Sequence, residues 1–371
     1  MADSDSDSVD DPQSQHEDEE DEDPDLDVFD QVRATIQLDS LPALASRLRS
    51  KEQAESSYNC RVLHKPTFGS HHILFQVEFS DGLRWLLKVP ADGYPGAFED
   101  SSARALRSEA LTMRYIKRRT TIPVPEVYHF EYSCDNGLCC PFILMEYIDG
   151  LPLQRVWYNH STSARILHEY RSRALRGIAE AMVQLNNFKY PYGGAVTFDD
   201  KGNPSDIGPF RRMDLAGIVH RVFHTDDDDD SNIYTTVGPF ADVKSFFTGM
   251  LDKREVPKGD YYRGAYKLLK YFIDLAFAKD GIQQGPQFVL SHPDFNLQNT
   301  MVSEDGNLVG IIDWDGVVAV PSCLGNSRYP IWLTRDWDRL DYRYVEKSVP
   351  GRPGCQNNRE GSPSELRHYR E

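Results

Sequence analysis

Two apolar stretches in the last third of the chain each end in polar residues that could take part in chemistry. The first, residues 288–290, leads into the segment "HPDFNLQN", which carries Asp294 and Asn299. The second lies within "LVGIIDWDG" and ends at Asp313. Because Pro293 interrupts regular strand pairing, Asp294 and Asn299 are expected on a loop. A carboxylate at such a position can accept a proton from a hydroxyl group.

The same residues predict a site for a divalent cation. Mg²⁺ prefers oxygen ligands such as the Asn299 amide and the Asp313 carboxylate, and it is usually held by one or two protein groups together with substrate phosphates. A base aspartate, an asparagine ligand and a metal-binding aspartate are the parts of a phosphoryl-transfer site. Taken singly, Asp294 and Asn299 would be turn residues. His292 is interpreted as a structural histidine beneath the loop, and Asp315 as a turn or supporting residue rather than a ligand.

These motifs resemble those of the aminoglycoside phosphotransferase and choline kinase-like superfamily, and in particular its fungal phosphotransferase-family proteins. "HPDFNLQN" followed by "IIDWD" is similar to the paired catalytic and metal motifs of these small-molecule kinases. "MRYIKRRTTIPVPEVYHF" and "FILMEYIDGLPL" belong to the same pattern, and the likeness runs from about residue 60 to 335. The resemblance implies an α+β, two-lobed protein-kinase-like fold, with a small antiparallel-sheet N-lobe and a mainly helical C-lobe.

The resemblance also implies a lysine that contacts nucleotide phosphates and a helix glutamate that pairs with it, for which the sequence offers Lys88 and Glu109. Helical spacing gives independent support, because Glu109 falls inside the apolar stripe of its predicted helix. That stripe is formed by Leu106, Ala110, Met113 and Ile116. A buried carboxylate is costly unless a cation accompanies it. A Lys88–Glu109 pair is therefore expected, although a purely structural ion pair would have the same signature.

The remaining nucleotide contacts are implied by the resemblance alone. In "TFGSHHILF", Gly69 and Ser70 would form the loop over the phosphates, although the segment is not GxGxxG. The hinge that presents backbone groups to adenine would be formed by Met145, Glu146, Tyr147 and Ile148. No GxxxxGK[ST] motif occurs, so a P-loop mechanism is not indicated.

Periodicity predicts the elements that position these residues. Residues 72–89 alternate as two strands around Asp81-Gly82, a favoured hairpin turn. This alternation places Lys88 and Leu86 on the face opposite Trp85. A helix at 103–119 and strands at 125–132 and 141–148 would complete an antiparallel sheet crossed by one helix. Further helices are expected within 28–50, 163–188 and 261–280, and a hairpin at 300–313.

Composition suggests the limits of the ordered chain. Residues 1–30 contain 15 acidic and no basic residues, and the rest of the chain has 43 acidic and 41 basic residues, so the folded part is nearly neutral. We expect a disordered acidic tail at 1–27. N-terminal helices at 28–54, an N-lobe at 55–147, a C-lobe at 148–348 with an irregular insert at about 190–260, and a disordered tail at 349–371 would follow.

Charge and hydropathy limit the classes of partner that this protein is expected to bind. A nearly neutral folded part lacks the basic face of nucleic-acid-binding proteins. No stretch approaches the ~20 apolar residues of a membrane span, and neither a secretory signal nor a myristoylation site is recognised. We therefore expect a cytoplasmic protein with no membrane or nucleic-acid partner. The oligomeric state is not predicted.

The resulting functional hypothesis is an ATP-dependent phosphotransferase that uses Mg²⁺ and moves the γ-phosphate to a hydroxyl of a small molecule. Asp294 would be the base, Asn299 and Asp313 would hold Mg²⁺, and the acceptor stays open. The alternative is a non-catalytic, nucleotide-binding or scaffold protein with the same fold and a truncated C-lobe, since only 58 residues follow Asp313. A protein kinase is disfavoured because no DFG or APE segment occurs.

Overall fold

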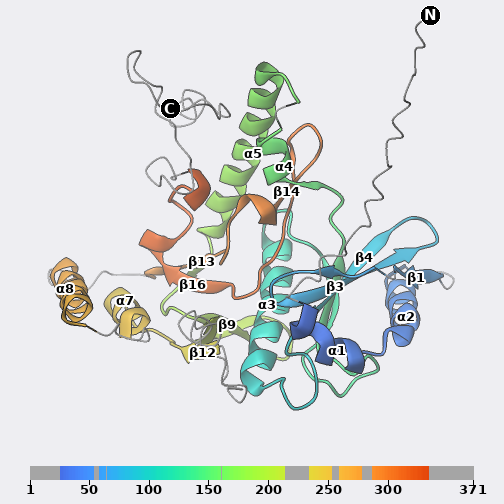
Figure 1. Cartoon of the computed structure of the whole chain (residues 1–371), viewed down its shortest axis with the longest axis horizontal. Coiled ribbons are helices and arrows are strands. Elements are labelled where there is room, and N and C mark those ends of the chain that lie inside the picture. Colours follow the sequence, from blue (N-terminus) through green and yellow to red (C-terminus); the bar gives the residue numbers. More distant parts are fainter. Residues whose placement is uncertain are drawn as a thin grey trace, which may run out of the picture.

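The computed structural model describes residues 26–53, 58–63, 65–159, 161–213, 234–252, 259–277 and 286–333. The chain has two lobes, one built on an antiparallel sheet and one containing the longest helix (Figure 1). The predicted acidic tail lies outside these residues as far as residue 25, and Leu26–Phe29 form the 3₁₀ helix η1 instead. The predicted C-terminal tail and the aspartate run 226–230 also lie outside them. The predicted fold class, α+β with two kinase-like lobes, is confirmed.

The N-lobe comprises the elements from η1 to β6 and is organised around a sheet with the strand order β1-β3-β4-β6-β5, in which β2 pairs with β3. All of these pairings are antiparallel. The strands are β1 (Cys60–Val62), β2 (Thr67–Phe68), β3 (His72–Phe79), β4 (Arg84–Pro90), β5 (Val127–Glu131) and β6 (Phe142–Glu146). Strands β3 and β4 form the hairpin that alternation predicted, and Gly82 takes a positive φ of 86° in its turn.

Two helical layers cover the two faces of this sheet. Helices α1 (Asp30–Thr35) and α2 (Leu41–Gln53) pack on the face that carries the alternating apolar residues of β3 and β4. These residues are Ile73, Phe75, Val77, Phe79, Trp85, Leu87 and Val89. The long helix α3 (Asp100–Arg119) packs on the opposite face, against Ile143 and Met145. Side chains alternate along β4, so Lys88 lies on the α3 side.

The C-lobe, from β7 onward, combines helices with several short sheets. Its helices are α4 (Leu153–Trp157), α5 (Ala164–Leu185), α7 (Val243–Asp252) and α8 (Asp260–Ala276). Two three-stranded sheets pair β16 (Val318–Pro321), β13 (Phe288–Ser291) and β8 (Lys189–Tyr190), and β15 (Leu308–Ile311), β14 (Thr300–Val302) and β7 (Leu151–Pro152). The polar segment 292–299 connects one sheet to the other.

The insert at 190–260 is more regular than its composition suggested. Strand β9 (Ala195–Phe198) pairs with β10 (Pro204–Gly208), and β11 (Phe210–Met213) pairs with β12 (Tyr234–Val237). Each of these strands has only four or five residues, too few for alternation to stand out among Gly, Pro and Asp. The insert therefore forms two small ribbons, and Val196, Phe198, Ile207 and Val237 contribute to the core.

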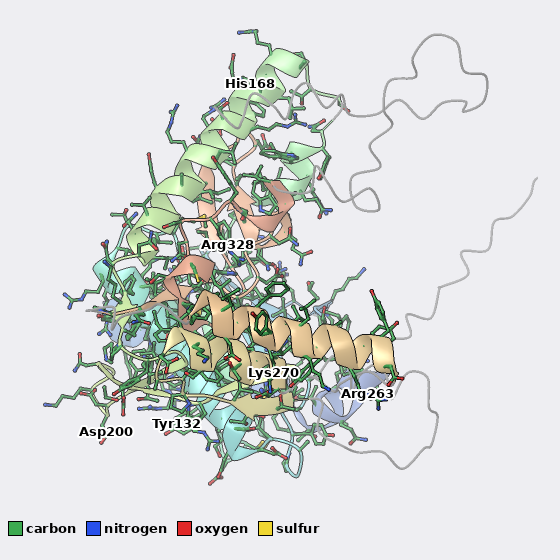
Figure 2. All side chains as sticks on the ribbon, turned by 90° about the vertical axis from the view of Figure 1, so that its left-hand side faces the viewer. Tyr132, His168, Asp200, Arg263, Lys270 and Arg328 are labelled. Carbon is green, nitrogen blue, oxygen red and sulfur yellow. The ribbon has the colours of Figure 1, made fainter. Side chains whose placement is uncertain are left out.

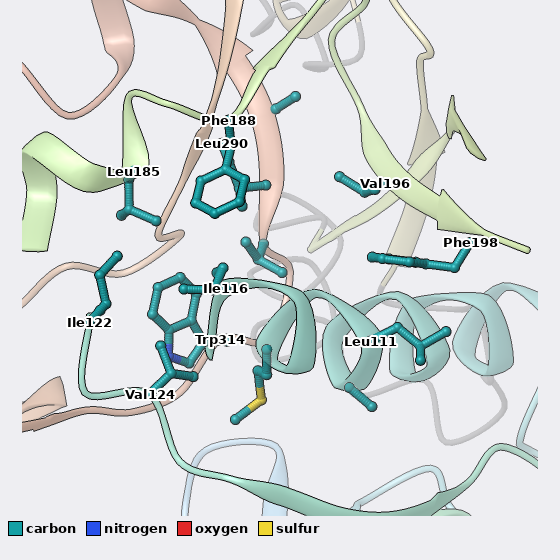
Figure 3. Packing of buried hydrophobic residues seen from close by; sticks show 14 of the residues in the cluster. Leu111, Ile116, Ile122, Val124, Leu185, Phe188, Val196, Phe198, Leu290 and Trp314 are labelled. Atoms are coloured by element: carbon teal, nitrogen blue, oxygen red, sulfur yellow. The ribbon is translucent and has the colours of Figure 1, made fainter. Parts of the chain in front are cut away.

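One apolar cluster joins the lobes. It contains α3 residues from the N-lobe and residues from α5, β9, β13 and β15 of the C-lobe. Figure 3 shows Ile116 of α3 near Trp314, with Ile122 and Val124 beyond them and Phe198 at the other end of the helix. Trp314 is fully buried, and its Nε1–H donates to the Ile311 carbonyl at 2.8 Å. This packing fixes the backbone on both sides of Asp313. Among the described helices, none is long and apolar enough to cross a membrane.

Candidate functional site

Lys88 lies at the junction between the lobes. Its Nζ donates to Glu109 Oε1 at 2.9 Å and to Asp313 Oδ1 at 3.2 Å. Glu109 belongs to α3, whereas Asp313 follows β15 and is 225 residues away from Lys88 in the sequence. Lys88 and Glu109 are buried, while the Asp313 side chain is half exposed. The pair predicted from helical spacing is present, and the same ammonium also reaches the C-lobe.

Electrostatics explain how this lysine keeps its charge. Burial lowers the pKa of Lys88, but the carboxylates of Glu109, Asp313 and Asp315 outweigh that effect and hold the pKa above its ordinary value. Burial raises the pKa of Glu109 to about 7, and Lys88 opposes that rise. An ammonium surrounded by carboxylates in a partly dry site is well placed to receive the oxygens of a phosphate chain.

The β14–β15 hairpin brings Asn299 and Asp313 to the same end of one ladder. Thr300 pairs with Ile311, and one step beyond this pair the Ile312 N–H donates to the Asn299 carbonyl at 2.9 Å. Asp313 is the next residue, and its φ of 61° lies in the left-handed region that few non-glycine residues adopt. Such strain persists only where the surroundings enforce it, and it is often stored at functional sites.

The loop before the hairpin places Asp294 against Asn299. Asn299 Nδ2 donates to the backbone carbonyl of Asp294 and to its Oδ2, both at 3.0 Å. Because both bonds use the amide nitrogen, the amide oxygen of Asn299 is directed away from Asp294. Asn299 is buried and Asp294 is exposed. The structure therefore brings Asp294, Asn299 and Asp313 into one neighbourhood around the hairpin end.

His292 connects this loop to the hairpin from below. Its Nε2 lies 2.9 Å from the Ile312 carbonyl, and since a carbonyl can only accept, Nε2 carries the proton. Burial lowers the pKa of His292 to about 4, although the Ile312 carbonyl and neighbouring Asp313 oppose the shift. Its Nδ1 is buried without a hydrogen-bond partner among the described residues. His292 is thus a neutral, buried ring that packs edge-on against Trp314.

The donor set suits a hard cation. Asn299 offers an amide oxygen, and Asp313 offers the half-exposed carboxylate that touches Lys88 through one oxygen. The described residues hold no group of three or more His, Cys, Asp or Glu side chains arranged to bind a metal by themselves. Mg²⁺ bound with nucleotide needs only one or two protein ligands, because phosphates and waters complete its octahedron. The residues present therefore fit a cation that arrives with a phosphate chain.

The predicted hinge lies between the N-lobe sheet and the β14–β15 hairpin. The N–H groups of Glu146 and Tyr147 donate to the carbonyls of Glu126 and Arg84, so these two donors are already used. Within the described chain no backbone bond uses the N–H or the carbonyl of Ile148. Ile148 sits against Gly310, where an added Cβ would come within 2.7 Å of its side chain. Ile148 therefore has both backbone groups left for a ligand, whereas Met145 lies in β6 and pairs with Leu86 of β4 and Val127 of β5.

Gly69 and Ser70 lie at the exposed tip between β2 and β3. The Gly69 N–H donates to the His72 carbonyl at 2.9 Å, which closes a tight loop. An added Cβ on Gly69 would make only an ordinary contact, so close packing does not require glycine there. The loop leads directly to His72, whose Nε2 lies 4.0 Å from Asp315 Oδ2. The start of β3 therefore lies near the segment that carries Asp313.

Sequence reasoning missed His72 and Arg211. Burial lowers the pKa of His72 well below its ordinary value, and nearby Lys88 adds to this effect, so His72 is neutral beside Asp315. Arg211, on β11 of the insert, donates to Asp92 Oδ2 at 2.9 Å and to Ser102 Oγ. These hydrogen bonds connect the insert to the start of α3 and to the loop before it. No local motif marks either residue, because each acts through partners far away in the sequence.

Two hollows adjoin these residues. A cavity of about 120 Å³ opens beside Asp294, and its wall includes Ser291, Asn296, Asn326, Arg328 and Tyr329. A cavity of about 330 Å³ lies between α3 and the insert ribbons, and Glu109, Arg211 and Asp315 contribute to its lining. A substrate in the smaller cavity would be in contact with Asp294. The larger cavity is lined by Glu109 but not by Lys88.

The chain matches the sequence pattern of the "Phosphotransferase enzyme family" over residues 69–229 and 251–321. It is 37% identical over 327 residues to "Altered inheritance of mitochondria protein 9, mitochondrial" of Vanderwaltozyma polyspora, with 76% of this chain and 50% of that protein covered. The protein of the same name from Kluyveromyces lactis is 24% identical, with 76% and 51% covered. The chain therefore spans about half the length of the curated relatives it matches.

Two solved structures align with about three quarters of this chain at low identity. A putative fructosamine-3-kinase from Thermobifida fusca has a TM-score of 0.44 and 17% identity, with 76% of this chain and 75% of that chain covered. A thermostable mutant of the aminoglycoside phosphotransferase APH(4)-Ia, in its apo form, has a TM-score of 0.40 and 14% identity, with coverage of 74% and 72%.

The names of the relatives correct the expected location. These relatives are named as mitochondrial proteins, so the prediction of a cytoplasmic protein is wrong. That prediction depended on composition and on the lack of recognised signals, and neither property encodes the compartment in which a folded domain works.

Proposed function

Since the chain belongs to the phosphotransferase enzyme family, we propose that it transfers the γ-phosphate of ATP to a hydroxyl group of a small molecule. The single observation that carries the proposal is the convergence on Lys88. One ammonium contacts the α3 glutamate and the carboxylate after β15, next to the loop in which Asn299 binds Asp294. A structural ion pair would need only Glu109, whereas a phosphate site needs the C-lobe carboxylate as well.

In the proposed reaction, Asp294 takes the proton of the acceptor hydroxyl as the hydroxyl oxygen attacks the γ-phosphorus. A new phosphorus–oxygen bond forms, and the bond from the γ-phosphorus to the bridging oxygen breaks, leaving ADP with that electron pair. Asp294 suits this role because it is exposed, next to a cavity, and oriented by Asn299 Nδ2. General-base assistance of this kind contributes roughly 100- to 10,000-fold to a rate.

The other residues position and neutralise the phosphate chain. Lys88 donates to phosphate oxygens, and Glu109 holds it in place. Asn299 and Asp313 would hold Mg²⁺, which when bound neutralises charge on the phosphate oxygens. Gly69 and Ser70 cover the phosphates, and the adenine lies along the hinge at Met145, Glu146, Tyr147 and Ile148. The backbone groups of Ile148 are the best placed of these to bind it.

The acceptor would enter the cavity beside Asp294. Its described wall carries amide, hydroxyl and guanidinium groups as well as Trp332, so a polar metabolite with an apolar portion fits its chemistry. The cavity of about 120 Å³ is small compared with typical ligand sites of ~300 Å³ and above. A compact acceptor is therefore favoured over a large antibiotic.

The test is transfer of labelled γ-phosphate from ATP to a small-molecule metabolite extract in the presence of Mg²⁺. The proposal predicts a labelled product that is absent when Mg²⁺ is removed. A thermal-shift series with ATP and Mg²⁺ separates this function from the scaffold alternative, because a ligand at 100 times its Kd stabilises by about 2.7 kcal/mol. Labelling that never rises above the rate of spontaneous hydrolysis, together with a clear shift, would favour a non-catalytic nucleotide-binding protein.

The proposal includes a mitochondrial location, which the names of the curated relatives support. Fractionation of cells that express the tagged chain tests this part separately from the chemistry. Recovery of the chain outside mitochondria would refute the location and leave the phosphotransfer proposal intact.

A further inference from the structure

Helix α8 turns its apolar side away from the protein. It has 17 residues, and none of them is buried. In Figure 1 it lies at the edge of the molecule beyond α7, and in Figure 2 it crosses the front of the molecule as a separate rod. A surface helix of a globular protein normally packs its apolar stripe on the core and exposes its polar side, so α8 has the reverse orientation.

The inward side of α8 combines polar and apolar contacts, since Phe277, just past the helix, stacks on Phe247 of α7 with ring centroids 5.8 Å apart. Its least exposed residues are Tyr266, Lys270, Ile273 and Phe277, the residue that follows the helix. Asp252 of α7 accepts from Tyr266 Oη at 2.6 Å and pairs with Lys270 at 2.7 Å. A second ion pair joins Lys244 of α7 to Asp274 at 2.8 Å. These contacts fix which side of α8 faces the protein.

The outward side carries a regular apolar row, which we name the α8 seam. It consists of Tyr261, Ala265, Leu268, Phe272 and Leu275, spaced by four, three, four and three residues. This is the spacing by which two helices pack along a shared line. All five are exposed, and Tyr262, Leu269 and Tyr271 flank the row and are also exposed.

The exposed apolar area on this side of α8 is close to that of a protein–protein interface. The seven large apolar side chains on this side of α8 are each more than half exposed. Since such side chains present about 100 Å² apiece at this exposure, together they offer roughly 700 Å², close to the ~800 Å² that each partner buries in a standard interface. Monomeric proteins rarely leave contiguous apolar patches of this size uncovered.

The charges around the seam disfavour a lipid surface. Membrane-surface helices carry a free, Lys/Arg-rich polar side. On α8, Lys270 is paired with Asp252, Arg263 with Asp260, and Asp274 with Lys244. Among the described charged residues of α8, Lys267 alone makes no ion pair, so the apolar row is flanked by a single free charge and not by a Lys/Arg-rich side.

We propose that the α8 seam is a homodimer interface, in which α8 of a second copy of this chain packs against it around a two-fold axis. A row with heptad spacing is self-complementary under such an axis, because the same residues meet from both sides. Leu268, the middle residue of the five, then lies next to its own copy. Gly264 and Ala265, at the start of the row, allow close approach because no atom stands within 4 Å of a Cβ added at Gly264.

The first test is the mass of the full chain in solution, measured by sedimentation velocity from about 1 to 100 µM, the range that detects a micromolar Kd. The wild type should form a concentration-dependent dimer. Leu268→Glu combined with Phe272→Glu should raise the dimer Kd by about 100-fold or more, because charges would enter the centre of the interface. The matched control is Val183→Glu, an exposed apolar position on α5, which should dimerise like the wild type.

The second test locates the contact. With a thiol cross-linker, Leu268→Cys should give a covalent dimer well above the background of the native cysteines, whereas Val183→Cys should not. A wild type that stays monomeric at the highest concentration would overturn the proposal. So would a dimer that is indifferent to the two glutamates, or a monomer that binds anionic phosphatidylserine vesicles through the seam. The full chain could also be monomeric and dimerise only when residues 334–371 are removed. That result would overturn the proposal, because it would show that the chain's own C-terminal segment occupies the seam.

Discussion

The site around Lys88 at the junction between the lobes, here called the cleft, and helix α8 distribute polar and apolar groups in opposite ways. At the cleft, the charged Lys88 and Glu109 are buried and contact each other at 2.9 Å. On α8, Leu268, Phe272 and Leu275 are more than half exposed and face away from α7. Both arrangements run against the usual distribution of residues. We propose that the buried charges at the cleft serve to bind a phosphate chain and that the exposed apolar side chains of α8 serve to bind another apolar surface.

The largest effect should come from the exposed carboxylate at the cleft. Asp294→Asn removes the base, so phosphate transfer should fall by roughly 100- to 10,000-fold while nucleotide binding changes little. Labelled-phosphate transfer and calorimetric nucleotide titration measure the two properties. Asp305→Asn is the control, since Asp305 lies at the far turn of the same hairpin and pairs with Arg173. Equal losses in the two variants would show that the hairpin fold, and not the base, was disturbed.

Next in size is the buried pair. Lys88→Met leaves the buried Glu109 without its cation and should lower the free energy of unfolding by about 3–5 kcal/mol, whereas Glu109→Leu should cost less because Lys88 keeps its contact with Asp313. Combining both changes should cost much less than the sum. Denaturant unfolding checks this, and the exposed Arg165–Glu169 pair on α5 is the control, with an expected effect of about 0.5 kcal/mol or less. Additive losses in the double variant would contradict a coupled pair at the cleft.

The buried histidine beneath the loop gives a pH dependence. Its folded pKa of about 4 lies below the ordinary value of 6.5, so the unfolded chain binds the proton more readily between these values. Stability is therefore retained above pH 6.5 and lost as the pH falls toward 4, by up to about 3 kcal/mol. The difference in the free energy of unfolding between pH 7 and pH 4 should be smaller by that amount in His292→Asn than in the wild type. An identical pH profile in that variant would mean that His292 is not held neutral by burial.

The smallest effect should be found on α8. Leu268→Ala should change the stability of the monomer by only about 0.5 kcal/mol, because the side chain is half exposed. Leu290→Ala, at a fully buried position of strand β13, should cost about 2–5 kcal/mol. Thermal unfolding at low protein concentration compares them directly. A large cost for Leu268→Ala in the monomer would mean that the chain itself covers the seam.

Much of the N-lobe could be predicted from sequence, because its pattern is strong and local. The eight residues of β3 alternate without a break, so the strand, its partner β4 and the side on which Lys88 lies follow from spacing. Glu109 could be identified because it interrupts an otherwise apolar helix stripe. Among the elements missed were β1 and β2, with three and two residues, and the strands of the insert, with four or five, whose patterns are too short to detect.

Long-range contacts and orientation were less predictable. The convergence of Asp294, Asn299 and Asp313 was expected from motif order, yet the contact of Lys88 with Asp313 joins residues 225 apart in sequence. The ends of α8 were nearly correct, but its apolar stripe would normally indicate a buried side. Its real orientation is set by Asp252 and Lys244 of α7, which pair with its polar residues. Compartment was wrongly predicted because no folded-state property encodes it.

If Lys88, Asn299 and Asp313 form one site for a nucleotide and its cation, ATP binding should depend on Mg²⁺ through Asp313. The most direct measurement is calorimetric titration with ATP at increasing Mg²⁺ concentrations, on the wild type and on Asp313→Ala. Mg²⁺ should tighten ATP binding to the wild type by tenfold or more, about 1.4 kcal/mol, and this dependence should disappear in Asp313→Ala. Equal Mg²⁺ dependence in the two proteins, or no ATP binding by the wild type at millimolar concentration, would rule out this shared site.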